Sequence, residues 1–170
     1  SQEHYGELVA MDRSIGTLRK SLRDLEIEKN TLLWFTSDNG GLPRIQPSTT
    51  GGLRDFKGSM YEGGLRVPAI ISYPAKLPKG AVRGQIITAM DWFPTVLSLC
   101  GVKQPAKAPK LDGFNLHPII HNAKAQLPRR TLHFAWGNKW AVREGDWKLI
   151  GVAGRPRVTL HNLADAKPEV

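Results

Sequence analysis

The chain has 170 residues, of which 41% are apolar, enough for one hydrophobic core and a small second module. Its formal net charge is +9, which favours anionic partners, but the basic residues are scattered and form no dense run, so we expect no nucleic-acid partner. No apolar run approaches the ~20 residues that cross a bilayer, so no membrane partner is expected.

The first predicted elements are an amphipathic helix over residues 5–25 and a strand over residues 31–37. In the helix, apolar side chains recur at helical spacing on one face: Leu8, Ile15, Leu18, Leu22 and Leu25. The strand is continuous, β-branched and aromatic, which is typical of a strand buried on both faces of a largely parallel sheet. A helix followed by a buried strand indicates an α/β architecture.

Residues 38–64 are rich in glycine, so a shaped loop is expected between this strand and a second buried strand over residues 67–73. Loops at the carboxyl ends of parallel strands are where α/β proteins place their ligands. The glycine-rich segment is therefore the first place to look for a site.

A second core helix is predicted to begin after Asp91, which would cap it, and to end at Gly101. The one cysteine, Cys100, lies in this stretch, so an intrachain disulfide and a cysteine-based zinc site are excluded. Its neighbours are apolar, and we expect Cys100 to be a core residue.

The pattern of apolar segments changes after residues 103–112, a basic connection that contains prolines. From about Thr131 to Leu163 the apolar segments are short, aromatic or β-branched, and partly alternating. Residues 144–146 are placed to turn one hairpin. A small antiparallel sheet is expected here.

Three side chains of the glycine-rich segment are candidates for binding chemistry. Asp38 and Asn39 present oxygen atoms directly after the first strand, and oxygen ligands suit a hard cation such as calcium or magnesium. Lys57, beside Gly58, is a point charge that suits an anionic oxygen. Asp-Asn-Gly is equally ordinary turn chemistry, and a single lysine is usually a surface residue. The residue types alone leave both interpretations open.

A structural role is expected for two further residues of the same loop. Glu62 and Arg66 are four residues apart beside a pair of glycines. They are expected to form an ion pair that braces the loop.

The strings LLWFTSDNGG (residues 32–41) and KGSMYEGGLRVPAII (residues 57–71) resemble the two downstream signature segments of the sulfatase family, within the alkaline phosphatase superfamily. Residues 90–102 and 111–120 are similar to the family's next helix and its leucine-aspartate-glycine segment. Residues 140–150 and 159–170 resemble strands of its C-terminal subdomain. The likeness covers nearly the whole chain.

The resemblance implies an α/β fold containing part of the alkaline-phosphatase-like mixed sheet flanked by helices, followed by a small C-terminal antiparallel sheet. Residues 1–125 would be the incomplete α/β domain and residues 126–170 a truncated subdomain. It implies that Asp38 and Asn39 are metal ligands, usually to calcium with magnesium as the alternative, and that Lys57 contacts the sulfate group. The implied substrate is a sulfated small molecule or glycan, and the implied location is periplasmic or secreted.

The departures from the family pattern concern parts that the family carries upstream. The resemblance implies catalysis by a formylglycine and a pair of acidic metal ligands, and neither the Cys/Ser-x-Pro-x-Arg segment nor that pair occurs here. We therefore expect a fragment that lacks the nucleophile, is inactive alone and needs the missing N-terminal part of the same protein. Because such a piece would expose apolar sheet edges, poor solubility or association is expected.

Two other functions remain as alternatives. A phosphodiesterase or phosphonate hydrolase of the same superfamily shares the sheet and the anion chemistry, although the Tyr-Glu-Gly-Gly continuation after Lys57 favours sulfate. A non-catalytic basic module that binds anionic polymers would show steeply salt-dependent binding without a calcium requirement.

Overall fold

The computed structural model describes residues 2–45, 49–166 and 169. By their contacts the residues group into two compact units, one comprising Ser1–Ser21, Trp34–Ile71 and Arg129–Val170, the other Leu22–Leu33 and Ser72–Pro128. The elements in chain order are α1 (Gln2–Asp24), η1 (Glu28–Asn30), β1 (Leu33–Thr36), α2 (Glu62–Leu65), β2 (Ala69–Ser72), η2 (Ala89–Asp91), α3 (Trp92–Cys100), α4 (His117–His121), β3 (Thr131–Trp136), β4 (Lys139–Glu144), β5 (Trp147–Val152) and β6 (Val158–Asn162).

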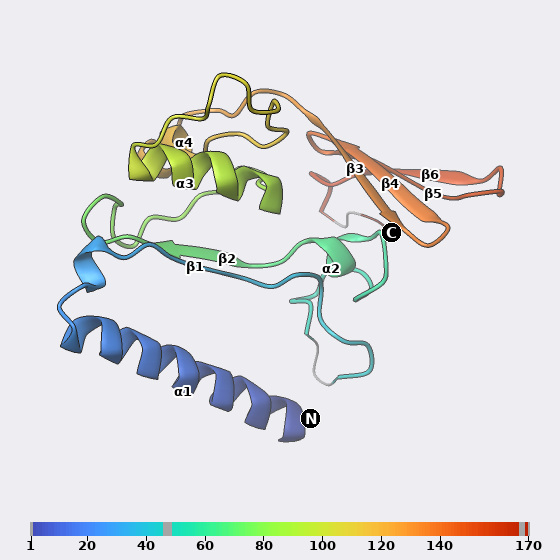
Figure 1. Ribbon diagram of the computed structural model, residues 1–170. Coiled ribbons are helices and arrows are strands. Elements are labelled where there is room, and N and C mark those ends of the chain that lie inside the picture. Colours follow the sequence, from blue (N-terminus) through green and yellow to red (C-terminus); the bar gives the residue numbers. More distant parts are fainter. Residues whose placement is uncertain (1, 46–48, 167–168, 170) are drawn as a thin grey trace. The chain divides into compact units, whose positions relative to one another are not determined.

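The predicted strands β1 and β2 form a two-stranded sheet, but they run antiparallel (Figure 1). Three hydrogen bonds give the direction, because residue numbers rise on one segment as they fall on the other: Lys29 O accepts from Ala75 N at 3.0 Å, Pro68 O from Thr36 Oγ1 at 2.9 Å and Gly64 O from Gly40 N at 2.9 Å. The strand over residues 31–37 is expected in a largely parallel sheet, but its one described neighbour is antiparallel.

The burial expected for these two strands is also absent within the part of the chain that the structure describes. All four residues of β1 are half-buried, and three of the four in β2 are exposed, among them Ile70 at 62%. A strand is buried on its faces only where other elements pack on the sheet, and the exposure of β2 shows that the described residues leave it largely uncovered.

Helix α1 is the long amphipathic helix that the apolar spacing predicts (Figure 1). None of its described side chains is buried. The apolar stripe is exposed or half-buried, with Leu8 at 41% and Leu18 at 45%. A stripe of this kind stabilises a helix only when another surface covers it.

The second unit is built around Asp91 and Thr95, both fully buried. The Asp91 carboxylate accepts hydrogen bonds from Thr88 N and Phe114 N, each at 2.7 Å. Thr95 Oγ1 donates to Asp91 O at 2.6 Å and accepts from Leu116 N at 2.9 Å. These bonds join α3 to the segment that leads into α4.

The predicted bounds of α3 are confirmed, while two details differ. Gly101 ends the helix with φ of 68°. Asp91 completes a capping box with Thr88 at η2 and makes no side-chain cap to α3 itself. Cys100 is exposed, because it is the last residue of α3 and lies off the face that buries Leu99.

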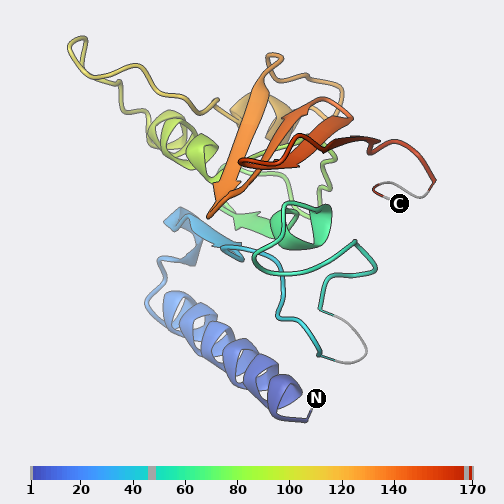
Figure 2. The same cartoon turned by 90° about the vertical axis from the view of Figure 1, so that its right-hand side faces the viewer.

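The predicted C-terminal sheet is confirmed as four antiparallel strands in the order β3-β4-β5-β6. Gly145, with φ of 59°, turns the β4–β5 hairpin. Figure 2 shows α2 beside this sheet, in the same compact unit. Across residues 2–45, 49–166 and 169, no helix combines the length and the hydropathy required to span a bilayer.

Candidate functional site

Asp38 and Asn39 follow β1 after Ser37, at a bend in the chain. Asp38 is exposed and Asn39 is half-buried. Ser37 Oγ donates to Asn39 O at 2.8 Å, which holds the bend. Two oxygen-bearing side chains are therefore presented side by side at the end of a strand, as the sequence predicts.

The backbone after this bend is pressed against the loop that leads into α2. A Cβ atom at Gly40 would lie 1.7 Å from Gly63 O, and one at Gly63 would lie 2.1 Å from Asp55 O. Both clashes are with backbone atoms, which cannot rotate away. The glycines are thus required by the close approach of two chain segments.

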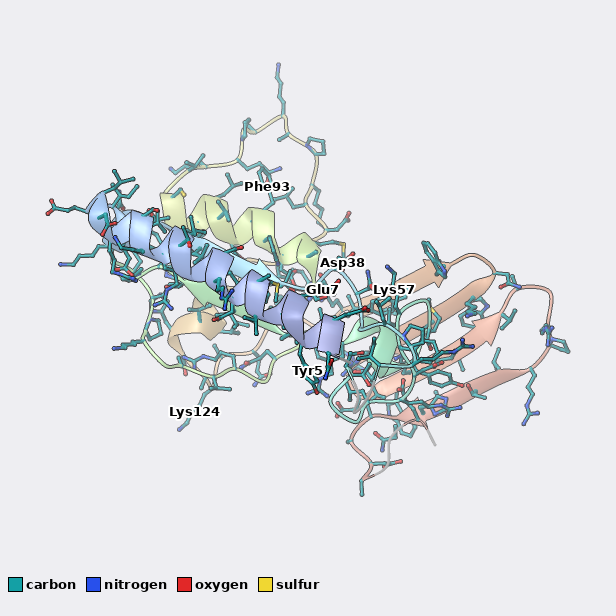
Figure 3. The ribbon with its side chains drawn as sticks, turned by 90° about the horizontal axis from the view of Figure 1, so that it is seen from below. Tyr5, Glu7, Asp38, Lys57, Phe93 and Lys124 are labelled. Atoms are coloured by element: carbon teal, nitrogen blue, oxygen red, sulfur yellow. The ribbon has the colours of Figure 1, made fainter. Side chains whose placement is uncertain are left out.

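Lys57 lies on the second of these segments, and its backbone N donates to Gly41 O at 3.0 Å. The next residue, Gly58, has φ of 84°, a conformation that other residues rarely adopt. The Lys57 side chain is exposed, and Asp38 and Lys57 fall in the same region of the view in Figure 3. The hydrogen bond from Lys57 N to Gly41 O joins the two backbone segments that carry the predicted metal-ligand pair and the predicted sulfate-contacting lysine.

Glu62, at the start of α2, is buried, but its ionic partners do not include the expected Arg66. Its carboxylate lies 2.8 Å from Lys148 Nζ and 3.1 Å from Arg143 Nη1. Arg66 is exposed and meets Glu62 only through the helical hydrogen bond from Arg66 N to Glu62 O at 2.7 Å. The expected Glu62–Arg66 ion pair is replaced, because two cations of the C-terminal sheet reach the buried carboxylate instead.

Lys148 is the centre of this buried ionic cluster, which comprises Glu62, Arg143, Lys148 and Glu169. Its ammonium is fully buried and also lies 2.8 Å from Glu169 Oε1. Glu169 Oε2 accepts from Glu62 N at 2.7 Å, at the N-terminus of α2, where a negative charge is favoured. Two carboxylates and two cations balance formally, as buried charges require.

Side chains on one face of the C-terminal sheet contact the segment 58–62 at regular intervals. Cross-strand partners share a face, so Trp136 and Lys139, Ala141 and Ile150, and Arg143 and Lys148 line up on one side. Lys139 Nζ donates to Gly58 O at 3.0 Å, Met60 packs in a core cluster with Ala141 and Ile150, and Glu62 binds Arg143 and Lys148. Alternate residues of the segment 58–62 thus meet successive pairs of the sheet, which fixes the position of Lys57.

The donors present fit a hard cation in kind but not in number. Calcium takes six to eight oxygen ligands. Asp38 and Asn39 supply one carboxylate and one amide oxygen, and among the described residues no group of three or more His, Cys, Asp or Glu side chains converges on one point. A calcium ion here would need further oxygen ligands besides these two side chains.

Comparison with known proteins identifies the group to which these features belong. The sulfatase family model matches residues 2–102, which is more than half of the chain. The chain belongs to the sulfatase family. Among curated sulfatases, N-acetylgalactosamine-6-sulfatase of Canis lupus familiaris is 37% identical over 149 residues and arylsulfatase A of Homo sapiens is 36% identical over 151. These alignments cover 85% and 83% of the chain, but it spans only 28% and 29% of the two relatives.

Solved structures agree with this membership. The sulfatase chain matches Ps i-CgsB, solved in complex with a neocarrahexaose, with a TM-score of 0.75 and 30% identity over 92% of this chain and 35% of that one. It also matches a protein solved with its substrate D-glucosamine-2-N,6-O-disulfate, with a TM-score of 0.73 and 25% identity over 92% and 32%. The α/β fold with a small antiparallel sheet is confirmed.

Sequence reasoning missed the residues through which the C-terminal sheet supports this part of the sulfatase. Lys148 is a lysine at an inward position of β5, in line with the buried Ile150. Alternation along the strand could have suggested it, but β5 carries apolar side chains on both faces, so the inward face could not be chosen. Glu169 offered no signal at all.

Proposed function

We propose that this chain is the C-terminal part of a sulfuric ester hydrolase in which Asp38 and Asn39 ligate a calcium ion and Lys57 contacts the sulfate group. The observation that supports the proposal is the joining of the two segments by backbone hydrogen bonds, Gly40 N to Gly64 O at 2.9 Å and Lys57 N to Gly41 O at 3.0 Å. A cation and an ammonium can then act on the same oxyanion.

The chemistry follows from where charge is concentrated. A sulfate ester carries negative charge on its oxygens, which shifts toward the leaving oxygen as the S–O bond breaks. Lys57 is exposed on a loop whose backbone is held by the bond from Lys57 N to Gly41 O, so the point from which its positive charge extends is set before substrate arrives. Calcium, where bound, polarises the sulfate oxygens as a Lewis acid. Asp38 and Asn39 would orient it from one side.

The nucleophile and the remaining metal ligands are assigned to a preceding part of the protein. The chain spans 28% of one curated relative, and a sulfatase formylglycine would lie in that other portion. The uncovered apolar surfaces support this assignment, because Leu8 and Leu18 of α1 and Ile70 of β2 are each more than 40% exposed. Burial of such side chains contributes about 1.5–3 kcal/mol each.

The decisive experiment uses the full-length protein with 4-nitrophenyl sulfate and with a matched phosphate diester. Lys57→Ala should lower kcat/KM for the sulfate ester by about 10²- to 10³-fold, the effect of losing one charge-stabilising donor. Lys79→Ala, another exposed lysine, is the control and should leave the rate unchanged. Hydrolysis of the diester alone would replace the proposal by its phosphoryl-transfer alternative. Equal rates for the two variants would remove Lys57 from the site.

The metal assignment has its own test. Asp38→Asn should weaken calcium binding, measured by titration calorimetry after chelation, whereas Asp112→Asn, at an exposed position, should not. Mass spectrometry of the full-length protein should detect the aldehyde of formylglycine. Calcium affinity that is identical in both variants contradicts the assignment of Asp38.

A further inference from the structure

The turn between β3 and β4 lies against the residue that follows Lys57. Lys139 Nζ donates to Gly58 O at 3.0 Å, and a Cβ atom placed on Gly58 would lie 3.9 Å from Trp136 Nε1. Consecutive Cα atoms are about 3.8 Å apart, so the indole and the ammonium border the Lys57 position. All these residues belong to one compact unit.

Trp136 is unusual for its exposure. Its side chain is on the sheet face that buries Leu132 and packs Phe134, yet the residue, the last of β3, is 67% exposed and lies outside the core cluster of Met60. A large aromatic surface left in water beside a charged loop is more typical of a binding surface than of a core.

We propose that Trp136 and Lys139 form a saccharide platform that binds the sugar unit next to the sulfated one, so that the preferred substrate is an anionic oligosaccharide. This rests on the proposed function of the Lys57 loop. The indole face is electron-rich and attracts the polarised C–H groups of a pyranose ring, while the indole N–H remains a donor for a hydroxyl.

Lys139 adds the preference for charge. An ammonium has three donors, and one of them is used on Gly58 O, which leaves two directed away from the backbone. Held by that bond, the ammonium keeps its position next to the indole. A carboxylate or a second sulfate on the neighbouring sugar satisfies it better than a hydroxyl does, because an anionic acceptor adds the attraction of opposite charges to the hydrogen bond.

The chain contains a matched control for Trp136. Trp147 is 56% exposed and belongs to the same sheet, but it pairs with Glu144 and so lies on the opposite face. Replacement of either tryptophan removes the same side chain from a similar degree of exposure. Of the two tryptophans, only Trp136 borders Lys57.

The test measures binding and hydrolysis by the full-length protein separately. Calorimetry with tetrasaccharides of chondroitin 6-sulfate, heparan sulfate and carrageenan identifies the tightest ligand, which is then compared with its sulfated monosaccharide. Trp136→Ala should weaken tetrasaccharide binding about 5- to 10-fold and leave monosaccharide binding within twofold. Trp136→Phe should restore most of the loss, and Trp147→Ala should have no effect. Lys139→Met should weaken only tetrasaccharides that carry a charge on the neighbouring sugar.

The outcomes separate this proposal from the one on which it rests. Equal affinities for Trp136→Ala and Trp147→Ala overturn the platform, and so does a wild-type protein that hydrolyses 4-nitrophenyl sulfate but binds no tetrasaccharide more tightly than the monosaccharide. A protein without sulfate ester hydrolysis whose tetrasaccharide binding still depends on Trp136 upholds the platform and overturns the proposed hydrolase instead.

Discussion

Replacement of Lys148 by methionine tests how the C-terminal sheet holds the Lys57 loop. The ammonium is fully buried and lies 2.8 Å from one oxygen of Glu62 and 2.8 Å from one of Glu169. After Lys148→Met, Glu62 keeps Arg143 at 3.1 Å, but the buried Glu169 carboxylate loses its cation. Removing one partner from a buried ion pair costs about 3–5 kcal/mol.

Amide hydrogen exchange in the full-length protein measures the loss of local stability that Lys148→Met causes. A loss of about 3–5 kcal/mol corresponds to exchange that is roughly 150- to 5000-fold faster in β5 and α2. The double variant Lys148→Met with Glu169→Gln should recover part of this loss, because it removes the unpaired charge. The single and double variants therefore separate lost packing from a stranded carboxylate.

A surface ion pair supplies the control for this experiment. Arg129 and Glu144 approach to 2.6 Å, closer than the buried pairs, but the Arg129 side chain is 84% exposed. Arg129→Met should therefore change local stability by less than about 1 kcal/mol. If Lys148→Met and Arg129→Met accelerate exchange to the same small extent, burial is not what gives the cluster its strength, and the reasoning fails.

Two further predictions concern backbone packing and a buried carboxylate. Gly40→Ala should destabilise the loop by several kcal/mol and abolish activity, because its Cβ would lie 1.7 Å from a backbone oxygen. Gly16→Ala on α1, where a Cβ meets nothing within 4 Å, should be neutral or add up to about 1 kcal/mol of stability. Thermal unfolding distinguishes the two variants. Asp91→Ala should cost about 2–5 kcal/mol by leaving two partly buried N–H groups without their acceptor. Asp91→Asn should cost less, since one acceptor oxygen remains. A urea titration in which the two variants unfold together contradicts this account.

The parts of the fold that depend on local spacing were predictable. The apolar period gives α1, the turn residues at positions 144–146 give the β4–β5 hairpin, and Gly101 gives the end of α3. In each case the residues that decide the structure are within one element or one turn of each other. Periodicity and capping therefore carry the information.

The remaining features depend on partners far away in the sequence. Glu62 and Lys148 are 86 residues apart, and no local pattern prefers that pair to Glu62 and Arg66, which are correctly spaced for a helix. A buried lysine is also rare enough that sequence reasoning defaults to an exposed one. Likewise, the antiparallel course of β2 is set by how the glycine-rich loop reverses, which neither strand's composition encodes.

Because residues 58–62 contact the sheet at alternate positions, the number of residues in that stretch is constrained. The stretch is tied at both ends, by Lys57 N to Gly41 O and by Glu62 to Lys148, so an inserted residue must bulge outward unless Glu62 loses its cations or Lys57 leaves its place beside Gly41. The loop can therefore tolerate changes of side chain far better than changes of length, whereas the exposed turn at residues 136–139 is free of that constraint on length.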